Sequence, residues 1–144
     1  MHLTKSKLLV EQLGFDFTDC PDIAQTLAVT TGALNVPAFF TGLHTLKIKE
    51  TDRIAALKTE LEKFGILVQA GEDTMKIKER ARNNAVANSS PPIATYEDHR
   101  MAMCFAPLAF LYPSITIEHP EVVNKSYPDF WTDLEKVGFV IEEA

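Results

Sequence analysis

The stretch "TDRIAALKTELEKFGILVQAGEDTMKIKE", residues 51–79, decides the fold. Its first half carries apolar residues at the spacing of one helix face, namely Ile54, Leu57, Leu61 and Phe64. This spacing predicts a helix over 51–65 that has Thr51 as its N-cap and ends at Gly65. Its second half, "ILVQAG" and "TMKIKE", alternates apolar and polar residues around "GED", which predicts a hairpin. A helix followed by a hairpin indicates an α/β (α+β) chain with helices packed on sheets.

Three short segments of the chain resemble one another: "VEQLGF" at 10–15, "LEKFGI" at 61–66 and "LEKVGF" at 134–139. Each is typical of a helix end, a glycine C-cap and the start of a strand. The chain therefore looks like a repeated α/β unit with a longer insertion in its last copy. Around the first copy we expect strands at "FDFT" and "VPAFFTGL", with a helix between them that opens at Pro21.

The second half of the chain contains a polar loop and a buried helix. The loop, "RARNNAVANSSPP" at 80–92, has too few apolar residues to pack. The stretch "ATYEDHRMAMCFA" at 94–106 begins a helix that we expect to run to about Leu111, with a bend at Pro107. A strand at "SITIEH", a helix at "YPDFWTDLEKVG" and a strand at "FVIEE" complete the expected order.

Composition limits the possible partners and compartments. The 144 residues correspond to about one domain, and the net charge of −6 argues against nucleic acid or anionic membrane as a general partner. The two cysteines, Cys20 and Cys104, do not make a disulfide framework, and Cys104 lies in an apolar run typical of a buried thiol. No apolar run approaches the ~20 residues that span a bilayer, and no signal-like segment begins the chain. These features predict a cytoplasmic location.

A cluster of charges in "KIKETDR" precedes the helix of 51–65. Its members are Lys47, Lys49, Glu50, Asp52 and Arg53. The unpaired N–H groups and the positive dipole at a helix N-terminus suit an anion. The alternative is a solvated first turn whose acids cap the helix.

His99 and Arg100 lie in the first turn of the expected buried helix. A long uncharged run follows them, so the two cations are expected to be partly desolvated and to need an anionic partner. That partner is either one of the preceding acids, Glu97 or Asp98, or a bound ligand. The residues alone leave both open.

All the candidate groups lie at strand-to-helix junctions, which a repeated unit can bring to one edge of the fold. Arg53, Arg100 and the loop residue Lys125 could then converge on one multiply charged anion. Glu50 would be available for proton transfer, as would Asp22, unless Asp22 serves only as an N-cap. The sequence has no zinc-type His/Cys spacing, no Walker loop and no GxGxxG. The residues therefore indicate a site for an anionic, phosphorylated metabolite.

Three of these stretches together resemble the C-terminal part of the 5-enolpyruvylshikimate-3-phosphate synthase (3-phosphoshikimate 1-carboxyvinyltransferase) family. They are "LKIKETDRIAALKTELEKFG", "ATYEDHRMAMCFA" and "KSYPDFW", in the family's order. The resemblance implies repeated β-α-β-α-β-β units, part of one domain of an inside-out α/β barrel. It also implies transfer of the enolpyruvyl group of phosphoenolpyruvate to the 5-hydroxyl of shikimate 3-phosphate, with release of phosphate. This step of the shikimate pathway, which leads to chorismate and aromatic amino acids, uses no cofactor and no metal.

The resemblance implies roles for residues that would handle shikimate 3-phosphate. Asp22 would take the proton from the 5-hydroxyl. Glu50 would protonate the methylene carbon of phosphoenolpyruvate and later help to remove a proton. Lys49 would contact shikimate 3-phosphate near the reacting hydroxyl. Thr45 stands where many members carry an asparagine that touches this substrate, so the chain departs from the family there.

The resemblance also implies a binding group for phosphoenolpyruvate. Arg53, Arg100 and Lys125 would grip its carboxylate and phosphate, and His99 would line the pocket. Glyphosate is implied as an inhibitor of the full enzyme. Another departure is Pro107, which falls in a helix that is usually uninterrupted.

The family chain is far longer than this one. The resemblance implies that residues 1–144 are a C-terminal fragment of one enolpyruvyl transferase domain and that the other, N-terminal domain is absent. A site between two closing domains would leave such a fragment inactive alone. An uncovered apolar face would favour its association.

Two other interpretations remain. One is a relative that transfers enolpyruvate to UDP-N-acetylglucosamine, although "DHRMAM" is not its signature. The other is a non-catalytic anion-binding module. The presence of both Asp22 and Glu50 favours catalytic descent, because simple anion binding needs neither carboxylate.

Overall fold

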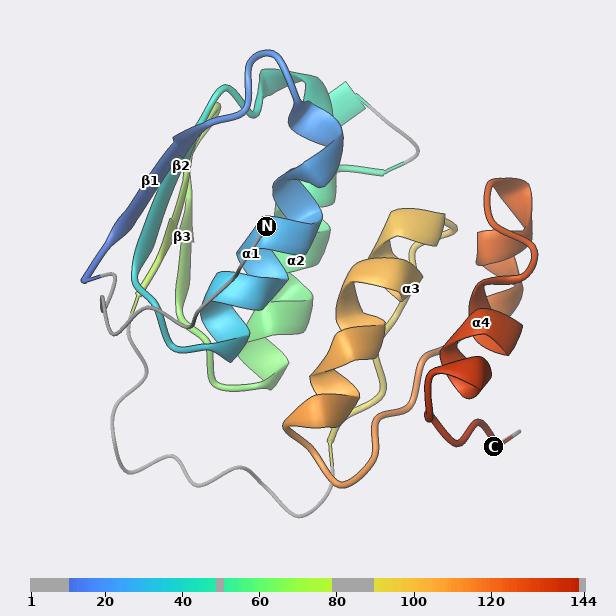
Figure 1. The fold of residues 1–144 in the computed structure, drawn as a ribbon. Coiled ribbons are helices and arrows are strands. Elements are labelled where there is room, and N and C mark those ends of the chain that lie inside the picture. Colours follow the sequence, from blue (N-terminus) through green and yellow to red (C-terminus); the bar gives the residue numbers. More distant parts are fainter. Residues whose placement is uncertain (1–10, 49–50, 79–89, 143–144) are drawn as a thin grey trace, which may run out of the picture.

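A four-stranded sheet covered on one face by helices forms the first half of the structure, a computed structural model that describes residues 11–48, 51–78 and 90–142 (Figure 1). The strands are β1 (Leu13–Asp16), β2 (Ala38–Thr41), β3 (Val68–Ala70) and β4 (Met75–Ile77). Their order is β1-β2-β4-β3. β1 and β2 are parallel, whereas β4 runs antiparallel to both of its neighbours.

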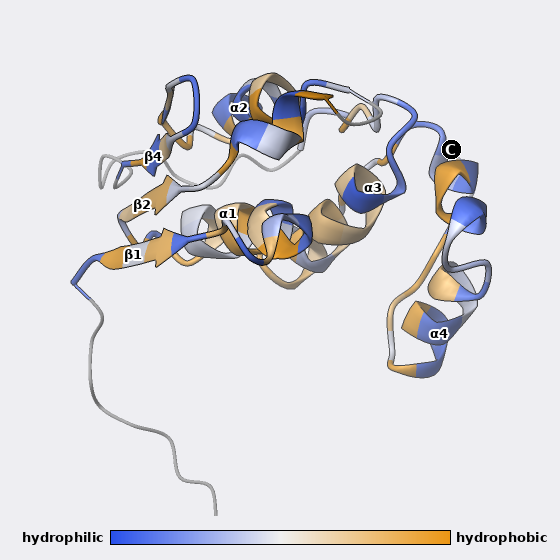
Figure 2. Cartoon of the chain, turned by 90° about the horizontal axis from the view of Figure 1, so that it is seen from above, coloured by the Kyte–Doolittle hydropathy of each residue, from blue (hydrophilic) through white to orange (hydrophobic). Residues whose placement is uncertain are grey.

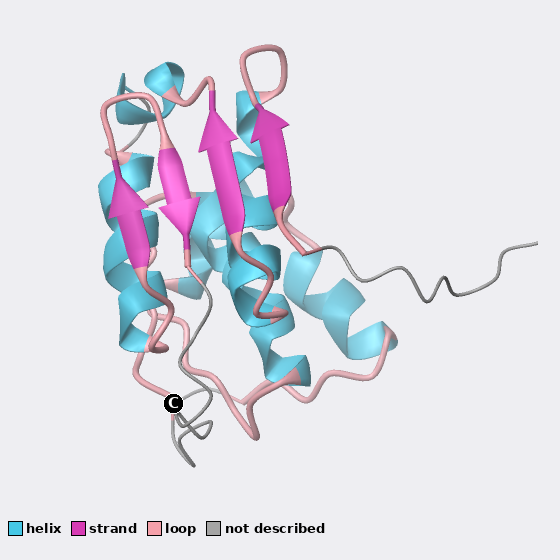
Figure 3. Cartoon of the chain, turned by 90° about the vertical axis from the view of Figure 1, so that its left-hand side faces the viewer, coloured by secondary structure: helices cyan, strands magenta, loops and turns pink. Residues whose placement is uncertain are grey.

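Two helices connect the strands into one β-α-β-α-β-β unit. The 3₁₀ helix η1 (Pro21–Ile23) leads into α1 (Ala24–Ala33), which joins β1 to β2. A second 3₁₀ helix, η2 (His44–Ile48), and then α2 (Arg53–Lys63) join β2 to the β3–β4 hairpin. Figure 3 shows the four strands in front of the helices, so the helices lie on one side of the sheet. The predicted fold class is confirmed.

The core lies between this sheet and α1, α2 and the next helix. Strand residues alternate: Phe40 points into the core at 1% exposure, whereas its neighbour Phe39 is 42% exposed. The predicted face of α2 is buried as expected, and its apolar and polar sides are visible in Figure 2. Burial of each such large apolar side chain stabilises the folded state by about 1.5–3 kcal/mol. This packing holds the helices, and therefore their first residues, in fixed positions relative to one another.

The second half of the chain adds further helices beyond α1 and α2 (Figure 1). α3 (His99–Phe105) continues as a tighter 3₁₀ helix, η3 (Ala106–Phe110). Pro107 lies in the first turn of that 3₁₀ segment, where its missing N–H disturbs the α-helical pattern, as expected. The 3₁₀ helix η4 (Pro120–Lys125) and then α4 (Phe130–Lys136) follow.

Two predicted strands in this half do not form. The segment 114–119 makes only one parallel bridge, between Ile93 and Ile117, since among the described residues no longer partner strand lies beside it. Residues 139–142 of the expected last strand are irregular. Most of the polar loop expected at 80–92 lies outside the described residues.

Local boundaries differ from the prediction at two points. The N-cap of α2 is Asp52 rather than Thr51, because the Asp52 carboxylate accepts a hydrogen bond from the N–H of Ala55 at 3.0 Å. Gly14 does not end a helix but lies inside β1, which pairs with β2. The first of the three similar segments was therefore wrongly interpreted.

The other two similar segments end helices as predicted. Gly65 has φ 72° and follows α2, and Gly138 has φ 104° and follows α4. Positive φ costs glycine little, which is why it is favoured at a helix end. No helix in the described part is long and apolar enough to cross a membrane.

The cysteines differ in environment. Cys104 is buried in α3, and burial raises the pKa of its thiol. Cys20 is only half-buried. We expect a thiol reagent at neutral pH to modify Cys20 first and to reach Cys104 only in denaturant, because the thiolate is the reactive form. Titration of thiols with a chromogenic disulfide, native and in urea, measures this; equal rates in the native protein would contradict it.

Candidate functional site

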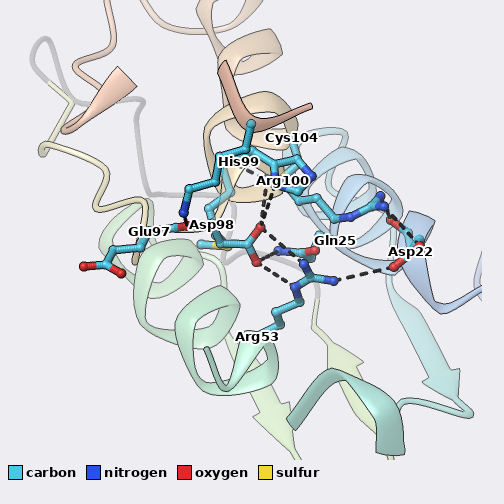
Figure 4. A network of polar contacts seen from close by, with 10 residues as sticks. Asp22, Gln25, Arg53, Glu97, Asp98, His99, Arg100 and Cys104 are labelled. Atoms are coloured by element: carbon cyan, nitrogen blue, oxygen red, sulfur yellow. Dashed lines mark hydrogen bonds and ion pairs between the residues drawn. The ribbon is translucent and has the colours of Figure 1, made fainter. Parts of the chain in front are cut away.

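Three helix starts meet at one edge of the fold. η1 supplies Asp22, the first residue of α2 is Arg53, and α3 begins with His99 and Arg100 directly after its N-cap Asp98. Figure 4 shows these side chains directed toward one another from three separate elements. The junctions therefore come together as the sequence predicted.

A buried ion pair forms the base of the site. Arg53 is 1% exposed, and its Nε lies 2.6 Å from Oδ2 of Asp98, which is fully buried. Nη2 of Arg53 makes a second, longer contact of 3.4 Å to Oδ1. The amide of Gln25, also fully buried, donates to Oδ2 at 3.4 Å. Such paired charges lock their elements in place, because removal of one partner leaves an uncompensated buried charge.

Asp98 also caps α3. Its Oδ1 accepts a hydrogen bond from the backbone N–H of Arg100 at 2.9 Å. The sequence offered Asp98 or Glu97 as an ion partner for the adjacent cations. Asp98 does lie 4.0 Å from Nδ1 of His99, but its shorter ion pair is with Arg53. Figure 4 shows the carboxylate of Glu97 directed away from this network. Asp98 thus joins α2 to α3, a role that only its position before an apolar helix could have suggested.

Asp22 stands between two guanidinium groups. Nη2 of Arg100 lies 3.0 Å from Oδ2 of Asp22, and Nη1 of Arg100 donates to the backbone carbonyl of Asp22 at 2.8 Å. Nη1 of Arg53 lies 3.6 Å from Oδ1 of the same carboxylate. The Asp22 side chain is 51% exposed and the Arg100 side chain 33%. This outer pair faces solvent, so an incoming anion can compete for Arg100.

His99 and Lys125 flank these groups. The His99 side chain is 16% exposed, and its Nδ1 lies 4.0 Å from Oδ1 of Asp98. Lys125 is the last residue of η4 rather than part of the expected loop, and its Nζ donates to the backbone carbonyl of Glu97 at 3.2 Å. Lys125 therefore reaches the segment that leads into α3.

The residues expected to contact shikimate 3-phosphate are only partly visible. Lys49 and Glu50 lie outside the described residues. Thr45 lies in η2, and its buried Oγ1 has no hydrogen-bond partner among the described residues. Within the same ranges, no three His, Cys, Asp or Glu side chains come together as metal ligands would.

Comparison with known proteins shows the family of the chain. The family described as EPSP synthase (3-phosphoshikimate 1-carboxyvinyltransferase) matches residues 3–134. The chain belongs to the EPSP synthase family. A 3-phosphoshikimate 1-carboxyvinyltransferase of Bacteroides fragilis (strain YCH46) is 53% identical over 142 residues, which are 99% of this chain and 34% of that protein. One from Idiomarina loihiensis is 38% identical over 89% of this chain and 29% of its own length.

Solved structures of EPSP synthases share the fold. The EPSP synthase of Acinetobacter baumannii superposes with a TM-score of 0.70 at 27% identity, covering 82% of this chain and 27% of that one. This EPSP synthase family member thus spans about a third of the length of the curated relatives that it matches. These relatives are named 3-phosphoshikimate 1-carboxyvinyltransferases, which does not support the UDP-N-acetylglucosamine alternative.

Proposed function

We propose that this chain supplies part of the active site of a 3-phosphoshikimate 1-carboxyvinyltransferase. Residues 1–144 would be a C-terminal fragment of one domain of that enzyme, acting on phosphoenolpyruvate and shikimate 3-phosphate. The single observation that carries the proposal is the carboxylate of Asp22 held between Arg100 at 3.0 Å and Arg53 at 3.6 Å. The two arginines that pair with Asp22 could also bind an anionic substrate. The Asp22 carboxylate would then lie beside that substrate and could accept a proton there.

Phosphoenolpyruvate would bind at the outer cations. Arg100 is partly exposed and its fork of donors suits a carboxylate or a phosphate. Lys125, whose Nζ donates to the carbonyl of Glu97, would add a second cation, and His99 would line the pocket. Arg53 is buried against Asp98, so its contribution would come through Nη1, which faces Asp22.

The proposed reaction would use these residues in turn. Arrival of the anion would draw Arg100 away from Asp22 and leave that carboxylate to accept the proton of the 5-hydroxyl. The hydroxyl oxygen would then bond to the central carbon of phosphoenolpyruvate, while Glu50 would protonate its methylene carbon. Loss of phosphate and of one methyl proton from the resulting tetrahedral intermediate would restore the double bond. Lys49 and Thr45 would orient shikimate 3-phosphate. The hydroxyl of Thr45, which has no hydrogen-bond partner among the described residues, fits a polar ligand atom.

Two further expectations remain proposals. Glyphosate would inhibit the full enzyme, and the absent N-terminal domain would be the protein partner. The cytoplasmic location stays a prediction from the sequence.

A graft tests the proposed function. We expect the purified chain alone to release no phosphate from phosphoenolpyruvate in the presence of shikimate 3-phosphate, because half a site cannot enclose both substrates. A chimera in which this chain replaces the matching 142 residues of the Bacteroides fragilis relative is expected to turn over.

The parent relative is the positive control for that graft. A folded chimera without activity would contradict the proposed reaction. Sustained turnover by the isolated chain would contradict the proposal that it is half of a site.

A further inference from the structure

A buried carboxylate on α2 takes no part in the proposed chemistry. Glu60 is fully buried. Its Oε1 accepts a hydrogen bond from the hydroxyl of Tyr96 at 2.8 Å, and its Oε2 accepts one from the backbone N–H of Ala94 at 3.2 Å. Nζ of Lys63, one helical turn later, lies 2.7 Å from Oε2 and also donates to the carbonyl of Pro92 at 2.9 Å. α2 therefore holds the segment 92–96 against its side.

That segment ends in an unfavourable backbone conformation. Tyr96 has φ 54° and Glu97 has φ 57°. Two consecutive left-handed residues without a glycine are rare, and they persist only where surrounding contacts determine them. The chain then enters α3 directly, with Asp98 as its N-cap and His99 and Arg100 as its first residues. The turn therefore sets the direction in which both proposed ligand residues leave the backbone.

The turn is held from several directions. The N–H of Asp98 donates to the carbonyl of Thr95 at 2.9 Å, and Lys125 donates to the carbonyl of Glu97 at 3.2 Å. Glu60 is the link to α2, and it follows Arg53 by two helical turns on the same helix face. α2 thus contacts the start of α3 at two points. Arg53 pairs with Asp98, and Glu60 accepts a hydrogen bond from Tyr96.

We propose that Glu60 and Tyr96 are positioning residues that fix His99 and Arg100 for binding of phosphoenolpyruvate. This inference rests on the proposed function. Two binding residues are pre-organised when the backbone that carries them is held in one conformation. Binding of the substrate then costs no free energy for ordering these residues. Burial and the neighbouring Glu60 carboxylate raise the pKa of Tyr96 to about 12. The Tyr96 hydroxyl is therefore protonated across the neutral pH range and remains a hydrogen-bond donor to Glu60.

Substitutions in the chimera separate positioning from general stability. Glu60→Gln leaves one acceptor oxygen for three donors, the hydroxyl of Tyr96, the N–H of Ala94 and Nζ of Lys63. Tyr96→Phe removes only the hydroxyl. We expect the KM for phosphoenolpyruvate to rise about tenfold for Glu60→Gln and by less for Tyr96→Phe. The KM for shikimate 3-phosphate should stay unchanged. A merely structural role would reduce the active fraction, and hence kcat, and leave both KM values alone.

Matched controls are available on α2 and beside α4. Glu62→Gln makes the same change at an exposed position of α2. Tyr127→Phe removes a hydroxyl that donates to Asp133 at 2.6 Å near α4. Both controls should keep the parent KM values. Equal KM values in the Glu60, Tyr96 and control variants, or equal shifts for both substrates, would overturn the inference.

A second measurement covers the case in which the unsubstituted chimera is inactive, so that the proposed function itself fails. In the 144-residue chain, the backbone amide NMR signals of His99 and Arg100 should shift in Glu60→Gln and Tyr96→Phe and stay in place in the two controls. Unshifted signals in all four variants would refute the positioning role, whatever the activity.

Discussion

Replacement of Asp98 with alanine is expected to lower the free energy of unfolding of this chain by about 3–5 kcal/mol. The change leaves the guanidinium of Arg53, which is 1% exposed, without the carboxylate that lies 2.6 Å from its Nε. It also removes the acceptor for the N–H of Arg100 at the start of α3. Domains of this size are stable by only about 5–15 kcal/mol, so the variant should be close to unfolding at ambient temperature.

Urea unfolding followed by circular dichroism measures this loss, and Asp52→Ala is the matched control. Asp52 is also an N-cap aspartate, accepting from the N–H of Ala55, but it lies at an exposed position. Its replacement should cost about 1 kcal/mol. The difference between the two variants therefore isolates the buried pair. If Asp98→Ala cost no more than Asp52→Ala, the pair would not hold α2 to α3.

A double variant distinguishes two causes of the loss of stability: the lost attraction between Arg53 and Asp98, and the cost of a buried Arg53 without its carboxylate. Arg53→Met combined with Asp98→Leu removes both charges and fills the space with apolar atoms. Replacing a buried pair in this way is often neutral or stabilising. We expect the double variant to regain most of the stability lost in Asp98→Ala, and the same urea titration shows whether it does.

The elements that the sequence predicted best are those whose signal is local. The helix of 51–65 and its hairpin depend on the spacing of apolar residues over one short stretch, and α2, β3 and β4 form there. Gly65 and Gly138 end helices because their positive φ is a local requirement. Strands need partners elsewhere in the chain. The segment 114–119 has a strand-like pattern yet makes a single bridge, through Ile117 to Ile93.

The site shows the same division. That Asp22, Arg53 and Arg100 meet agrees with the expectation that helix starts of a repeated fold lie at one edge. The partner of each charge could not be predicted. Asp98 lies beside two cations in sequence, but it pairs with Arg53, which is 45 residues away. Glu60 gave no signal either, because a glutamate within a helix is ordinarily exposed. Such pairings depend on distances between residues that are far apart in the sequence, and the spacing of residues along the chain does not predict those distances.

Replacement of Asp22 with asparagine is expected to lower kcat of the active chimera by about 10²–10⁴-fold, the range for loss of a general base. Asparagine keeps an oxygen for the guanidinium of Arg100, which now lies 3.0 Å from the carboxylate, but it cannot accept the hydroxyl proton. The KM for phosphoenolpyruvate should stay unchanged or fall, because one negative charge beside Arg100 is removed. Glu50→Gln should lower kcat in the same way, through loss of the proposed proton donor.

Steady-state kinetics, together with calorimetric titration of phosphoenolpyruvate, separates this outcome from its rival. Asp19→Asn is the control: it makes the same change of charge at an exposed position three residues before Asp22, and it should leave kcat unaltered. A non-catalytic anion-binding module would bind phosphoenolpyruvate more tightly after Asp22→Asn and would have no turnover to lose. Full activity in the Asp22→Asn chimera would remove Asp22 from the reaction. The 3.0 Å and 3.6 Å contacts of Asp22 would then serve only to join η1 to the starts of α2 and α3.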